Sequence, residues 1–93
     1  MALTPEQLAQ LEKAANAAGD AAAVAESKLQ GLTAGTNAFA EAQVAASKAS
    51  LESSQAELQY AREKGKSREV IQRLTEEVSG ASEEYKKQAA ALA

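Results

Sequence analysis

A stripe of apolar residues recurs at alternating intervals of three and four positions near the N-terminus. Its members are Leu8, Leu11, Ala15, Ala18, Ala22, Ala25, Leu29 and Leu32. Such spacing places side chains on one face of an α-helix, whereas a strand requires alternation every second residue. The same spacing is typical of a coiled-coil seam. The pattern therefore predicts one long helix, over about residues 5–31, whose packing face is mostly alanine.

Short polar and glycine-containing segments divide the rest of the chain into two further helices. Thr4, Pro5 and Gln7 form the pattern of a helix N-terminus with a capping box. Residues 31–36 contain two glycines and two threonines, which end one helix and cap the next. Gly65 suits a helix C-terminus and Ser67 a new N-cap. We expect the second helix at about 37–64 and the third at about 67–92.

The second and third predicted helices carry apolar stripes of their own. In the second, large and small residues alternate, a pattern that favours close packing of antiparallel helices; its members are Val44, Ser47, Leu51, Ser54, Leu58 and Ala61. In the third, Gln88 is the only strongly polar member of the stripe, which comprises Ile71, Leu74, Val78, Ala81, Tyr85, Gln88 and Leu92.

These elements predict an all-α chain that forms a single helical domain over residues 1–93. Short connections make successive helices antiparallel neighbours. We expect an antiparallel hairpin of the second and third helices plus the N-terminal helix, as a three-helix bundle or coiled coil. The pattern leaves open whether the first helix packs along this hairpin or leaves to join another copy.

The supply of large apolar side chains is small for an independent core. Leu, Ile, Val and Phe together occupy 15 of 93 positions, while alanine occupies 24. That share lies below the roughly 20% that is typical of chains that fold readily. The chain has no cysteine and no histidine, so neither a disulfide nor a typical zinc site can stabilise it. Oligomerisation is the remaining means of stabilising so small a chain, and we therefore predict a homo-oligomer.

Charged residues are unevenly distributed along the chain. Positions 50–93 hold 15 of the 23 charged residues, whereas positions 14–49 hold five. Residues 14–25 carry alanine on nearly every side of the predicted helix. One interpretation is that several neighbours contact this stretch; the other is that alanine here is a helix former that tolerates water.

The residue inventory argues against catalysis. Without histidine or cysteine the chain cannot form a serine-hydrolase triad or a thiol active site, and it has no glycine-rich phosphate loop. We expect no enzyme activity, no cofactor and no metal. The N-terminus lacks the pattern of a secretion signal and no apolar stretch approaches a membrane span. The expected location is the cytoplasm or an assembled particle.

A basic cluster surrounds the second turn and is the best candidate for a contact with a partner or an anion. Its residues are Arg62, Lys64, Lys66 and Arg68, to which Phe39 and Tyr60 add aromatic side chains. Arg62 and Lys64 also stabilise a helix C-terminus, so the cluster can be purely structural. The net charge of −3 opposes nonspecific binding of nucleic acid, which leaves another protein as the better partner.

The sequence favours a non-enzymatic structural or assembly protein that associates with copies of itself. A small subunit of a phage particle, or of a bacterial appendage or secretion assembly, would have this character. The residues expected to carry packing and self-association are Leu8, Leu11, Ala15, Ala18, Ala22, Ala25, Leu29, Val44, Leu51, Leu58, Ile71, Leu74, Val78 and Tyr85. The alternatives are a small helical binding module (an adaptor, chaperone or inhibitor) and a sponge for a small anionic ligand.

Overall fold

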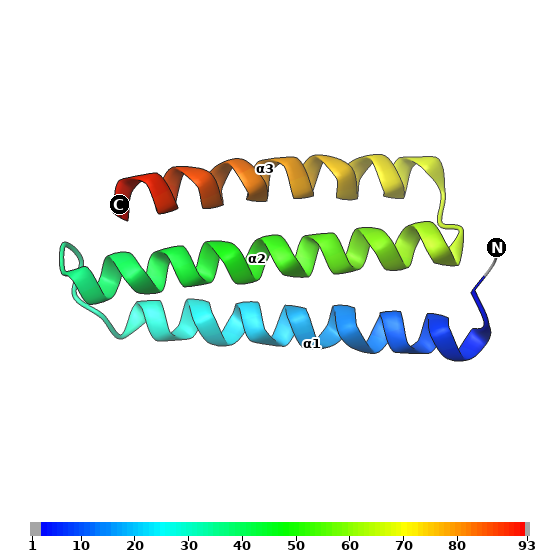
Figure 1. Ribbon diagram of the computed structural model, residues 1–93, viewed down its shortest axis with the longest axis horizontal. Helices are drawn as coiled ribbons and strands as arrows, with labels where there is room; N and C mark the ends of the chain where they lie inside the picture. Colours follow the sequence, from blue (N-terminus) through cyan, green and yellow to red (C-terminus); the bar gives the residue numbers. More distant parts are fainter. Residues whose placement is uncertain (1–2, 93) are drawn as a thin grey trace.

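The computed structural model describes residues 3–92, and this part of the chain forms three helices without any strand. They are α1 (Pro5–Gln30), α2 (Asn37–Lys64) and α3 (Arg68–Leu92). Figure 1 shows them side by side along one long axis, with each helix antiparallel to the next. The predicted all-α class is confirmed. Residues 1, 2 and 93 of the expected domain lie outside the described part.

The N-terminus of α1 is fixed by the predicted capping box. The backbone N–H of Gln7 donates to Thr4 Oγ1 at 3.1 Å, and the backbone N–H of Thr4 donates to Gln7 Oε1 at 2.9 Å. Pro5 occupies the first helical turn, where its missing N–H costs nothing. Two backbone donors at this end of the helix are thereby satisfied without tertiary contacts.

Each turn ends one helix and caps the next through backbone and hydroxyl groups. Thr36 caps α2 by accepting a bond from the backbone N–H of Phe39 at 3.1 Å. Gly65 ends α2 in the left-handed region, with φ of 77°. A Cβ at this position would be strained, which is why glycine suits it. The Ser67 hydroxyl then accepts a bond from the backbone N–H of Val70 at 3.4 Å at the start of α3.

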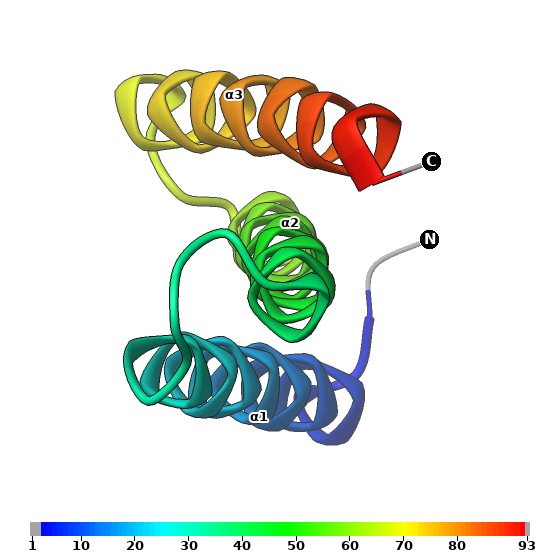
Figure 2. The same ribbon diagram turned by 90° about the vertical axis from the view of Figure 1, so that its left-hand side faces the viewer.

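The three helices form an open layer with α2 in the middle. Both α1 and α3 pack against α2, but no Cα atom of α1 comes within 8 Å of one in α3 in the described range. The end-on view in Figure 2 shows α1 and α3 on opposite sides of α2. The layer measures 47 × 22 × 19 Å. The fold is a helical bundle in which two of the three helices have only one helical neighbour.

The buried side chains divide between two separate interfaces. Between α2 and α3, near the second turn, Leu58, Ala61 and Leu74 form a small core, against which pack Val70, Ile71 and Val78. Along α1 the buried residue is Ala15, and near the other end of α2 it is Ala46. No described side chain is fully removed from water. A single core shared by all three helices is therefore absent from residues 3–92.

Candidate interaction surfaces

The central helix α2 has two packing faces, of which the apolar stripe in the sequence predicts one. The second face lies towards α1 and combines five small residues with one tyrosine; its members recur at intervals of four and three and are Ala42, Ala46, Ala49, Ser53, Ala56 and Tyr60. Tyr60 Oη donates to Glu12 Oε2 at 3.4 Å, and a Cβ built on Gly19 would lie 3.7 Å from Ser53 Oγ. The bond, and the closeness of Gly19 to Ser53, place this face against α1. The signal for this face in the sequence is the repeat of alanines along α2, beside the stripe that contains Leu51 and Leu58.

The fourteen residues predicted to carry packing are all buried or half-buried within the single chain. Ala15, Leu58 and Leu74 are the buried members, and the other eleven are partly exposed. Leu32, which closed the N-terminal stripe, lies in the first turn and is exposed. Burial within one chain thus accounts for part of the surface of each of these residues.

A groove crosses one face of the layer near the first turn. Its volume is about 420 Å³, and all three helices line it. Its lining combines carboxylate, amide and hydroxyl groups with a few apolar side chains: Glu26, Leu29, Gln30, Gln43, Ala46, Ser47, Ser50, Ala81, Glu84 and Gln88. The groove exists because α1 and α3 flank α2 without meeting over it.

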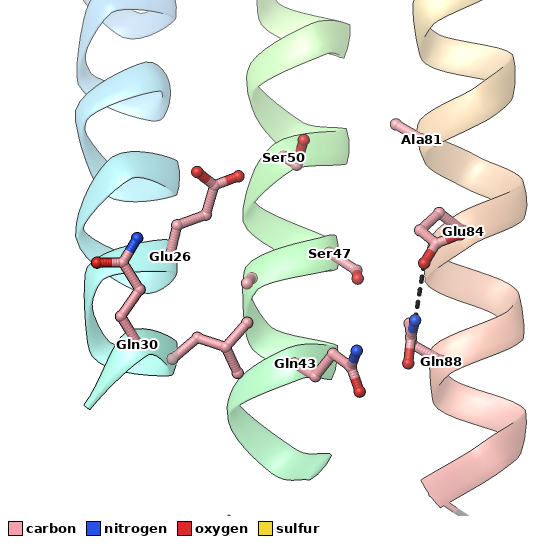
Figure 3. A pocket seen from close by; sticks show the side chains of 10 residues that line it. Glu26, Gln30, Gln43, Ser47, Ser50, Ala81, Glu84 and Gln88 are labelled. Carbon is pink, nitrogen blue, oxygen red and sulfur yellow. Dashed lines mark hydrogen bonds between the residues drawn. The ribbon is translucent and has the colours of Figure 1, made fainter. Parts of the chain in front are cut away.

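Figure 3 shows how the groove is built. Glu26 extends from α1 towards α2, and on the α3 side Gln88 Nε2 donates to Glu84 Oε1 at 2.7 Å. The small side chains of Ser47 and Ser50 lie on α2 between these two walls. Both walls carry a carboxylate and the lining includes no lysine or arginine, so the groove suits a polar or cationic group better than an anion.

The basic cluster occupies the opposite end of the layer. Arg62, Lys64, Lys66 and Arg68 come together around the second turn, and all four side chains are exposed. Tyr60 lies one turn away but faces α1 through its bond to Glu12. Phe39 is half-buried in the first turn of α2, at the far end of that helix. The structure therefore assembles the basic residues and separates Phe39 from them.

The outer faces of α1 and α3 differ in charge density. The exposed residues of α3 opposite α2 are dense in charge and include Glu76, Glu83, Lys86 and Lys87. On the corresponding face of α1 the charges are seven or eight residues apart, and Ala9, Ala17 and the 55% exposed Val24 lie between them; the charged residues are Glu6, Lys13, Asp20 and Lys28. A charged outer face is suited to water, whereas exposed alanine and valine are suited to a further helix.

Residues 3–92 show neither a metal-binding cluster nor a membrane-spanning helix. No group of three or more aspartates and glutamates in this range is arranged to hold a metal ion. None of the three helices is apolar enough over a sufficient length to cross a bilayer.

No protein-family model matches the chain, and no curated protein or solved structure is significantly similar to it.

Proposed function

We propose that this chain is a non-enzymatic assembly protein whose copies associate through helical faces that a single copy leaves uncovered. The observation that carries the proposal is the total exposed area of 6441 Å². A compact monomer of 9.6 kDa is expected to expose about 5,100 Å². The excess of roughly 1,300 Å² is more than the ~800 Å² that each partner contributes to a standard protein interface.

The open layer is the physical source of this excess. Because α1 and α3 each have one helical neighbour, most of their circumference faces solvent. The same layout limits the core, in which the most buried large side chain, Leu74, is still 5% exposed. Contact with a second copy would bury apolar surface that the single chain leaves exposed. Each Å² buried would stabilise the assembly by about 25 cal/mol, before the costs of association are subtracted.

The test is the mass of the wild-type protein in solution, measured by sedimentation equilibrium from micromolar to millimolar concentration. We expect a mass above the 9.6 kDa of one chain. This mass should rise with concentration, and the melting temperature should rise with it. A single chain at every concentration, with a cooperative and concentration-independent thermal transition, would contradict the proposal.

The groove favours a second candidate, a small helical binding module. Its polar lining and two carboxylates fit a cationic or hydrogen-bonding partner segment better than an apolar helix face. Ser50→Trp would fill the groove from α2, with Glu83→Trp on the outer face of α3 as a matched control. If the native protein is monomeric and Ser50→Trp alone abolishes binding of an isolated partner, the binding module is supported instead of the assembly protein.

A further inference from the structure

The charges of α1 separate into two sets. The helix carries six charged residues. Glu12 bonds Tyr60 of α2 and Glu26 lines the groove, so both lie towards the rest of the layer. The other four charged residues are exposed on the outer side of the helix; they are Glu6, Lys13, Asp20 and Lys28. Lys28 also borders a hollow beside α2.

The four outer charges alternate in sign along the helix. They are spaced seven, seven and eight residues apart, so they follow one stripe on the helix surface, close to two turns apart in each step. From the N-terminus onward, the signs are negative, positive, negative, positive. From the C-terminus, the signs read positive, negative, positive, negative. Two copies of the helix in antiparallel orientation therefore place opposite charges against each other along the stripe.

We propose that the outer face of α1 is the contact surface for α1 of a second copy, in an antiparallel dimer with two-fold symmetry. With the axis beside Ala17, Lys13 of each copy faces Asp20 of the other, and Glu6 faces Lys28. All four charges then meet an opposite charge at one register. A parallel pairing in register would place like charges together. The inference rests on the proposed function and names the surface and symmetry of the assembly.

The uncharged side chains of the stripe fit the same arrangement. Ala17 at the axis is small enough for the two backbones to approach closely, as small residues permit at tight helix crossings. The most exposed large apolar residue of the helix, Val24, lies opposite Ala9 and Gln10 of the second copy in this register. The axis therefore has small residues at its centre and apolar contacts on both sides.

The alternative surface on α3 lacks the apolar part of this arrangement. Its outer face carries Glu76, Glu83, Lys86 and Lys87, without an exposed apolar residue of the size of valine between them. Such a face gains little by leaving water. It provides matched positions for control substitutions.

Charge reversal tests the pairing directly. By symmetry Lys13→Glu turns two attractive pairs into repulsive ones, as does Asp20→Lys, so each should weaken dimerisation roughly tenfold. The double variant K13E/D20K restores opposite charges at both positions and should recover wild-type affinity. An equimolar mixture of the two single variants should form a heterodimer more tightly than either variant associates with itself.

The measurement is sedimentation equilibrium at low and high salt, with Glu83→Lys as the control and circular dichroism to verify that helicity is unchanged. Salt should reduce the difference between the variants, because it screens exposed charge pairs. Ala17→Glu places two carboxylates side by side at the axis and should also weaken dimerisation, whereas Ala90→Glu on α3 should not.

The outcomes separate this inference from the proposed function. If the wild type associates but the single reversals and Ala17→Glu leave its affinity unchanged, another surface is used and the antiparallel α1 pairing is wrong. Failure of the double variant or of the mixture to recover affinity also overturns the pairing. If the wild type is a monomer at every concentration, the proposed function itself fails and the pairing fails with it.

Discussion

The two halves of the layer join the same central helix in different ways. The α2–α3 half is held by branched side chains, with Leu58 and Leu74 buried against each other around Ala61. The α1–α2 half is held by small ones, with Ala15 buried on α1 and Ala46 on α2. The first interface stabilises by the area that each side chain buries. The second allows the backbones to pack closely but buries little area per residue.

The two outer helices therefore differ in how much apolar surface their packing against α2 leaves uncovered. The charged outer surface of α3 suits a helix whose one apolar face is already paired with α2. Around α1 the small residues extend to the outer face, where Val24 is 55% exposed, so pairing with α2 leaves apolar area uncovered. An interface of small residues should be sensitive to added volume, and an interface of leucines to lost volume.

The largest effect is expected for Leu74→Ala in the leucine-rich half. Leu74 is 5% exposed and contacts the core around Leu58, so its truncation leaves a cavity. We expect a loss of about 3 kcal/mol in the free energy of unfolding. Urea denaturation followed by circular dichroism measures it, at one fixed protein concentration. Leu11→Ala, at a half-buried position of α1, should cost clearly less. Equal losses at the two positions would contradict the contrast.

The second effect is expected for Ala15→Leu in the alanine-rich half. Ala15 is buried where α1 lies close to α2, so a leucine there forces the helices apart. Overpacking of this kind should cost about 2 kcal/mol. The control is Ala17→Leu, two residues along the same helix but exposed, which should leave unfolding of the single chain nearly unchanged. Denaturation of both variants below the concentration of self-association gives the comparison. A stabilised Ala15→Leu would show that the interface has unfilled space.

A smaller and stabilising effect is expected for Gly80→Ala. A Cβ at Gly80 would meet no atom within 4 Å. Alanine is a better helix former than glycine by about 1 kcal/mol. Gly19→Ala should stabilise by a similar amount, because its Cβ would lie in ordinary contact with Ser53 Oγ at 3.7 Å. Thermal denaturation compares the two variants. If Gly19→Ala destabilises the protein and Gly80→Ala does not, α1 and α2 lie closer together at Gly19 than the 3.7 Å distance indicates.

The smallest effect is expected for Tyr60→Phe. The bond from Tyr60 Oη to Glu12 Oε2 is 3.4 Å long and exposed. Its loss should therefore cost only about 0.5 kcal/mol or less. Glu12→Gln keeps an acceptor and should change stability even less. Both variants can be measured by urea denaturation. A loss above about 1 kcal/mol for Tyr60→Phe would show that this bond, and not alanine packing, holds α1 to α2.

The local structure was predictable because short-range chemistry decides it. The Thr4 capping box, the left-handed Gly65 and the Thr36 cap depend on atoms within a few residues, and all three are present. The interval of three and four residues likewise requires helices. The surfaces were less predictable, because a sequence shows which residues share a helix face but not which helix covers that face.

The three helices, their caps and their stripes of leucine, valine and alanine follow from the sequence, because backbone bonding and the helical period are local properties. The packing of the whole chain places α2 between its neighbours, sets its face from Ala42 to Tyr60 against α1, and keeps α1 and α3 apart. Burying an alanine side chain changes the free energy of folding only a little, because the side chain is small. A stripe of small residues therefore does not specify which helix covers it. That choice depends on the packing of the whole chain.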